Sequence, residues 1–280
     1  KNFNSKNLSN YFSGIVAYEN KNNLEALKFF KSSKFLISKH NPYLKRYIYA
    51  LVLEGKIQQA TIEIKQNLTK KNSSFFEAYL ILALDSLKRK DFKKTRDYLN
   101  QSFVFINNNK LELAIYKTLK QYLHVFEKNQ ILETKEKFGQ FSFINEVFQR
   151  CYLEDRDAQK YFEALINNTN NEDYSRYIFF NINYLIENNK FKEAQQITSK
   201  LNYLNSSLLI SQSKKWIEEK KLKNFNKIFS CKNSNDIIGE FFFLVANLYS
   251  SQDDYNRSNF YLNISHYLNP KFKYNLSLLV

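Results

Sequence analysis

The sequence predicts an all-α protein, and three observations support this class. Glycine and proline are rare, with four and two residues among 280, whereas folds rich in β-turns use both often. Apolar residues recur at intervals of three and four, as in Leu80, Leu84 and Leu87, which is the period of a helix with one buried face. Small residues recur at intervals of 34 and 35 near the start of the chain, so we expect the helices to form repeating pairs.

Short polar segments mark the ends of the predicted helices. The segments are NKNN at 20–23, NNN at 107–109, NNTNN at 167–171 and ENN at 187–189. Asparagine suits helix ends because it caps free backbone groups and tolerates a left-handed backbone. The helices between such segments would be about 12 to 15 residues long, and their short connections imply antiparallel neighbours.

A small residue follows a turn near the start of the second helix in each predicted pair. Ala26, Ala60 and Thr95 are separated by 34 and 35 residues, and Ala194 and Ser258 by 64, or two units of 32. Antiparallel helices approach closely only where side chains are small, and larger side chains one turn away fill the flanking grooves. An ordinary bundle gives no reason for this period, so we expect a solenoid in which each pair covers its neighbour.

The spacing within residues 244–270 resembles that of the tetratricopeptide repeat family. The small, aromatic and proline positions that carry the resemblance are Ala246, Tyr249, Tyr255, Ser258, Ser265 and Pro270. The first and third units follow the same offsets with Gly14, Ala17, Ala26, Phe30 and Ser33, and with Ala83, Phe92, Thr95, Leu99 and Ser102. The resemblance implies a right-handed α-solenoid of about seven to eight antiparallel helix pairs. The abundance of residues with AT-rich codons indicates a bacterial source.

We expect residues 1–280 to form a single solenoid that is a fragment of a longer repeat array. The match is better over 8–105 and 172–270, and degenerate over 106–171 and 205–235. Thr134 and Ala158 are expected at second-helix small positions, but only 24 residues separate them, so one first helix between them must be shortened or displaced. The apolar stretch KFKYNLSLLV after Pro270 is expected to begin the next first helix near residue 271.

The sequence contains no recognisable catalytic or cofactor motif. Its three histidines stand alone, and four scattered glycines cannot form a phosphate-binding loop. Cys151 and Cys231, 80 residues apart, have no metal-binding spacing; we interpret them as small buried residues, with a disulfide left open. No apolar run reaches the length of a membrane span. We therefore expect no enzymatic activity, no cofactor, no metal site, no transmembrane segment and no small-molecule substrate.

The resemblance implies a concave groove, lined by the first helices of successive pairs, that binds a peptide or a protein. The candidate residues on this groove are Tyr11, Ile15, Tyr18, Lys45, Tyr49, Leu80, Leu84, Phe179, Asn183, Phe243 and Asn247. One subtype of the family holds a carboxylate with a lysine and an asparagine in the same unit. Here the two never coincide, so the predicted groove is mainly aromatic and aliphatic, which suits anchoring of a partner.

The most direct functional expectation is a protein-interaction scaffold or adaptor without catalytic activity. A net charge of +15 keeps a second reading open, a binder of nucleic acid or another polyanion, although the basic residues are scattered. A third reading is a regulatory solenoid of a larger enzyme. A chain that begins at Lys1 and contains no methionine suits a cleaved export signal, so we favour the bacterial periplasm or cell envelope over the cytoplasm.

Overall fold

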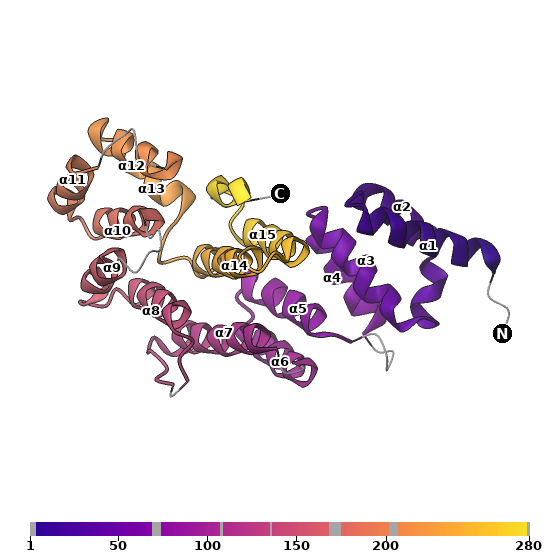
Figure 1. The fold of residues 1–280 in the computed structure, drawn as a ribbon. Helices are drawn as coiled ribbons and strands as arrows, with labels where there is room; N and C mark the ends of the chain where they lie inside the picture. The colour runs from indigo at the N-terminus through magenta and orange to yellow at the C-terminus, as the bar shows by residue number, and fades with distance from the viewer. Residues whose placement is uncertain are drawn as a thin grey trace.

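The computed structural model describes residues 4–68, 74–106, 109–134, 136–167, 175–201 and 207–278. These ranges contain fifteen α-helices, three short 3₁₀ helices and no strand, which confirms the all-α class (Figure 1). The α-helices are α1 (Ser5–Glu19), α2 (Asn23–Ser32), α3 (Asn41–Leu53), α4 (Ile57–Asn67), α5 (Phe76–Lys88), α6 (Phe92–Ser102), α7 (Lys110–Lys128), α8 (Gln140–Tyr152), α9 (Ala158–Ile166), α10 (Ser175–Glu187), α11 (Phe191–Ser199), α12 (Leu208–Glu218), α13 (Lys223–Ile228), α14 (Ser234–Ser250) and α15 (Tyr255–Leu268). The 3₁₀ helices are η1 (Lys34–Ser38), η2 (Phe103–Phe105) and η3 (Lys273–Leu278).

Seven helix pairs share one kind of turn: α1–α2, α3–α4, α5–α6, α8–α9, α10–α11, α12–α13 and α14–α15. In each turn one residue has a left-handed backbone, and these residues are Lys21, Gly55, Lys90, Glu154, Asn189, Lys220 and Asp253. The next residue donates its N–H to a carbonyl five residues earlier, as from Asn22 to Ala17 at 2.9 Å and from Asp254 to Tyr249 at 3.0 Å. This bond satisfies a free carbonyl at the helix end. Only one of the seven left-handed residues is the asparagine that the sequence led us to expect.

The small residues predicted near the start of the second helices are buried at the helix crossings. Ala26, Ala60, Thr95, Ala194 and Ser258 are at most 2% exposed, and each is the fourth residue of its helix. Glycine allows the closest approach in two pairs. A Cβ at Gly14 would lie 2.9 Å from the ring of Phe30, and one at Gly239 would lie 3.2 Å from the Cβ of Asn269.

Helix α7 has no second helix, and this is where the predicted phase fails. The described residues from Asn129 to Phe138 have no helical structure. Thr134 is exposed and donates its hydroxyl to the carbonyl of Glu136 at 3.2 Å, so its prediction as a buried crossing residue is wrong. Ala158 is buried but is the first residue of α9. The missing element is therefore a second helix, not a first helix.

The two cysteines join the two weakly repeating parts of the chain. Cys151 near the end of α8 and Cys231 between α13 and α14 form a disulfide with a Cα–Cα distance of 5.6 Å, and each is 1% exposed. Burial was expected, and the pairing settles the alternative that the sequence left open. The covalent link fixes α8 beside the segment that leads into α14.

The C-terminal pair lies inside the curve of the other helices (Figure 1). The path runs from α1–α4 through α5–α8 to α9–α13, and then α14–α15 return between them, with α15 against α3 and α14 against α5 and α8. The chain after Pro270 forms η3 rather than an α-helix, so the predicted start of another first helix is wrong; Leu279 and Val280 lie outside the described residues. Phe272 is 1% exposed and packs on Phe179 and Phe180 of α10.

Candidate functional site

Most residues predicted on the binding groove are buried. The seven residues that are at most 8% exposed are Tyr11, Tyr49, Leu80, Leu84, Phe179, Asn183 and Phe243. Ile15, Tyr18 and Asn247 are half-buried, and Lys45 is exposed. Apart from the edge of Tyr49, these buried side chains offer a partner almost no surface as they lie, so the exposed aromatic groove predicted from the sequence is not present in this arrangement.

The C-terminal segments cover several of these residues. The ring of Phe260 on α15 stacks on Tyr49 of α3 with centroids 4.5 Å apart, and Phe272 lies 5.5 Å from Phe179. Asn183 donates its amide to the carbonyl of Phe229 at 3.1 Å. The side chains that would line an open groove thus contact other parts of the same chain, and apolar burial stabilises that closed state.

Three of the predicted residues still meet in one accessible cavity, which we call the seam pocket. Its volume is about 350 Å³, and it lies where α1 and α3 meet α15. The lining residues are Tyr18, Pro42, Lys45, Arg46, Tyr49, Asp254, Asn256 and Arg257. Residues more than 200 positions apart in the sequence therefore form this cavity together.

Cations and aromatic rings dominate the walls of the seam pocket. The Lys45 ammonium lies 5.5 Å from the Tyr49 ring centroid, and the Arg46 guanidinium donates to the Tyr11 hydroxyl. Arg257 lies 3.6 Å from Asp254, the capping residue of its own helix. The lining holds three cations and one carboxylate, so an anion in the pocket would be attracted.

Glu77 of α5 lies behind the pocket and orders its wall. Glu77 is 2% exposed, and its carboxylate accepts a hydrogen bond from the Tyr49 hydroxyl and lies 3.4 Å from the Lys45 ammonium. Burial raises the pKa of Tyr49 well above its usual value, and the nearby Glu77 carboxylate adds to the shift. Burial, together with Glu19 and Asp254, raises the pKa of Tyr18 to about 12. Both phenols are therefore neutral at physiological pH, so Tyr49 stays a donor to Glu77 and neither phenol adds negative charge to the pocket.

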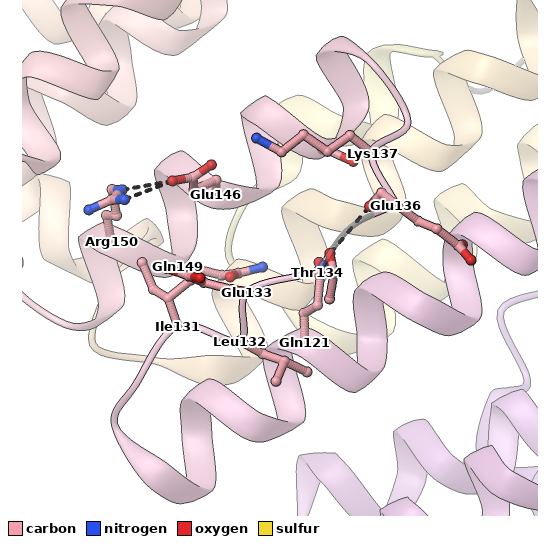
Figure 2. Close-up of a pocket in the computed structure, with 11 residues that line it drawn as sticks. Gln121, Ile131, Leu132, Glu133, Thr134, Glu136, Lys137, Glu146, Gln149 and Arg150 are labelled. Carbon is pink, nitrogen blue, oxygen red and sulfur yellow. Dashed lines mark hydrogen bonds and ion pairs between the residues drawn. The ribbon is translucent and has the colours of Figure 1, made fainter.

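A second cavity of about 340 Å³ lies between α7, α8 and the irregular segment that connects them. Figure 2 shows Arg150 beside Glu146 and the Thr134 hydroxyl beside the Glu136 backbone. Arg150 contacts both Glu146 at 2.8 Å and Asp155 at 2.6 Å, and Glu136 pairs with Lys117. Its lining holds three carboxylates and two cations, so this cavity lacks the positive balance of the seam pocket and is a weaker candidate for binding an anionic group.

The described part of the chain holds no cluster of three or more potential metal ligands. Of the histidines, His266 lies in the last turn of α15, and burial, followed by the charges of Lys273 and Lys88, lowers its pKa. Among the described helices, none combines the length and the apolar character that crossing a bilayer requires.

Comparisons with known proteins identify no relative. No family model, no curated protein and no solved structure matches this chain.

Sequence reasoning missed five of the eight residues that line the seam pocket. Arg46, Asp254, Asn256 and Arg257 carry much of its polarity but belong to no motif. Arg257 directly precedes the predicted crossing residue Ser258, and its side chain becomes part of a site only because α15 packs on α3. Nothing in the local spacing could indicate that contact.

Proposed function

We propose that this protein is a non-catalytic interaction module that binds a peptide or protein partner at the seam pocket. We also propose that its seven pairs form a right-handed solenoid of the tetratricopeptide type. The observation that carries the function is the cavity of about 350 Å³ whose walls combine Tyr18 and Tyr49 with Lys45, Arg46 and Arg257.

This mixture of side chains suits peptide recognition. Tyrosine and arginine are enriched among residues that contribute most to protein interfaces, and an aromatic ring loses little conformational freedom on binding. The Tyr49 ring is already fixed by Phe260 on one side and by its bond to Glu77. A wall that is ordered before binding lowers the entropic cost of association.

The disulfide supports the bacterial cell envelope as the site of action. Cys151 and Cys231 are paired and buried, and such bonds persist in oxidising compartments such as the periplasm rather than in the cytosol.

Selection from a random peptide library on the immobilised protein tests the function. We expect the selected peptides to lose at least tenfold in affinity, about 1.4 kcal/mol, for a Tyr18→Ala/Arg46→Ala variant. Ile62→Ala is the control, because Ile62 is 55% exposed and lies outside the pocket, and it should leave affinity unchanged. Failure to select peptides, or peptides indifferent to the pocket substitutions, would contradict the proposal.

A salt titration separates this function from polyanion binding. Peptide binding that uses aromatic walls should weaken only modestly between low and physiological salt, whereas nucleic-acid binding falls steeply because bound counterions are released. Tight binding of duplex or single-stranded nucleic acid at physiological salt, with no peptide selected, would favour the polyanion alternative.

A further inference from the structure

The contact between the first helices and α15 lacks an internal ion pair. Among the described residues, no salt bridge joins 4–68 to 234–278. The contact instead uses the Tyr49–Phe260 stack and polar bonds such as that from the Lys21 ammonium to the Asn256 side chain. We call this contact the seam.

Cations face the seam from both sides. Lys45 and Arg46 come from α3, and Arg257 comes from the first turn of α15. The Lys45 ammonium lies 5.5 Å from the Tyr49 ring centroid, and the positive charge of Arg257 acts on the Tyr49 phenol by opposing the rise in its pKa. Like charges across a contact repel each other, and the carboxylates of Glu77 and Asp254 offset only part of this repulsion because neither forms an ion pair with Arg46.

The existing acidic partners leave one cation without a carboxylate. Glu77 is matched to Lys45, and Asp254 is matched to Arg257 and also accepts the Arg257 backbone N–H at 3.0 Å. Arg46 bonds a neutral hydroxyl and has no salt bridge among the described residues. The buried Glu112 carboxylate also attracts Arg257 and Lys45, so Arg46 is the pocket cation that is left for an added carboxylate, and its guanidinium fork can present two parallel donors to that group.

We propose that the seam pocket takes the carboxylate side chain of an acidic peptide partner, and that this carboxylate bridges Arg46 of α3 and Arg257 of α15. The inference rests on the proposed function and adds the chemistry of the bound group and its effect. The aromatic walls formed by Tyr18 and Tyr49 accept an apolar residue beside the acid. Because the bridge exists only when the seam is closed, the partner binds the closed arrangement more tightly and stabilises it.

Two matched peptides test the bridge. The first is a short, N-acetylated and C-amidated peptide with two glutamates beside a phenylalanine, and the second has glutamines in place of the glutamates. Calorimetric titration of the full chain should show binding that is about tenfold tighter for the glutamate peptide, the effect of one charge-assisted hydrogen bond. Arg46→Gln and Arg257→Gln should each remove that preference. Arg156→Gln is the control, since Arg156 is exposed and lies outside the pocket. This variant should keep the preference for the glutamate peptide.

Amide hydrogen exchange of the protein, measured with each peptide bound, tests whether the bound carboxylate links α3 to α15. The glutamate peptide should slow exchange both in α3 and in the first two turns of α15, and Arg257→Gln should abolish the protection in α15. Protection confined to α3 would overturn the bridge even if the peptide binds.

The outcomes distinguish this inference from the proposed function. Equal affinity for the two peptides, with both lost in Tyr18→Ala, would leave the peptide-binding function standing and overturn the carboxylate bridge. Binding of the glutamine peptide only when its C-terminus is a free acid would also overturn the assignment to a side chain. Absence of binding for both peptides, together with an empty library selection, would overturn the proposed function and the bridge with it.

Discussion

The regularly repeating pairs and the irregular stretch around α7–α9 are stabilised in different ways. In α1–α6, α10–α11 and α14–α15 a small residue such as Ala60 lies at the same place in the second helix and is fully buried at the crossing. In the irregular stretch α7 has no partner helix among the described residues, and α8, which pairs with α9, is also held by the Cys151–Cys231 disulfide. The comparison shows that a covalent link takes over where the repeated crossing is lost.

The largest expected effect comes from removing that link. A Cys151→Ser/Cys231→Ser double variant should lose about 4 kcal/mol in the free energy of unfolding, since the disulfide closes a loop of 80 residues. Denaturant unfolding followed by circular dichroism measures this loss. An unchanged unfolding midpoint would mean that the disulfide does not stabilise the irregular stretch.

The next effect is a pH dependence of the folding stability, caused by a carboxyl group near Cys231 at the start of α14. Burial, with a further contribution from Glu187, raises the pKa of Asp236 from 3.8 to about 7, although the Ser230 N–H and Lys271 oppose the shift. A carboxyl with a raised folded-state pKa is protonated more readily in the folded chain, so stability is lost as pH rises from about 4 to about 7.

Asp236→Asn should remove most of this dependence. We expect the variant to exceed the parent chain by roughly 3 kcal/mol at pH 8 and to match it near pH 4. Unfolding curves across this pH range measure the difference. Parallel stability profiles for the two chains would contradict the shifted pKa.

A smaller effect is expected at the crossings of the regular pairs. Ala60→Leu should lower the free energy of unfolding by about 2 kcal/mol, because Ala60 is fully buried and the added atoms force α3 and α4 apart. Ile62→Ala in the same helix is the control and should change stability by less than about 0.5 kcal/mol, since Ile62 is largely exposed. Equal effects of the two substitutions on stability would contradict the close approach of α3 and α4 at Ala60.

The smallest effect tests the shared turn. Lys90 has a φ of 60°, which costs a residue with a Cβ about 1 kcal/mol relative to glycine. Lys90→Gly should therefore stabilise the chain by about 0.5 kcal/mol. The reverse change, Gly55→Ala at the one turn that already has glycine, should destabilise it by about 1 kcal/mol. Thermal unfolding resolves both, and effects of the same sign would refute the turn geometry.

Local spacing was enough to predict the helical class, the paired helices and the buried small residues. Ala26 and Ala194, for example, mark the crossing of two helices that follow each other directly in the chain, so their spacing predicts that contact without any longer-range information. The phase around Thr134 could not be predicted, because nothing short-range marks a helix that is missing.

Packing between helices that are far apart in the sequence determines which of these residues are exposed, and sequence periodicity does not predict that packing. Tyr49 and Phe179 have the spacing of groove residues, yet Phe260 and Phe272 cover them. The same return of the chain brings Arg257 to Lys45 and Arg46. Three predicted residues therefore lie in the candidate site for a reason that the repeat pattern does not contain.

The return of α15 onto α3 is the central structural claim, and a double-mutant cycle between Tyr49 and Phe260 tests it most directly. Unfolding free energies are measured for the parent chain, Tyr49→Leu, Phe260→Leu and the double variant. Rings stacked 4.5 Å apart should give a favourable coupling of about 1 kcal/mol. A coupling of zero would mean that the two helices do not pack together and that the seam pocket does not exist.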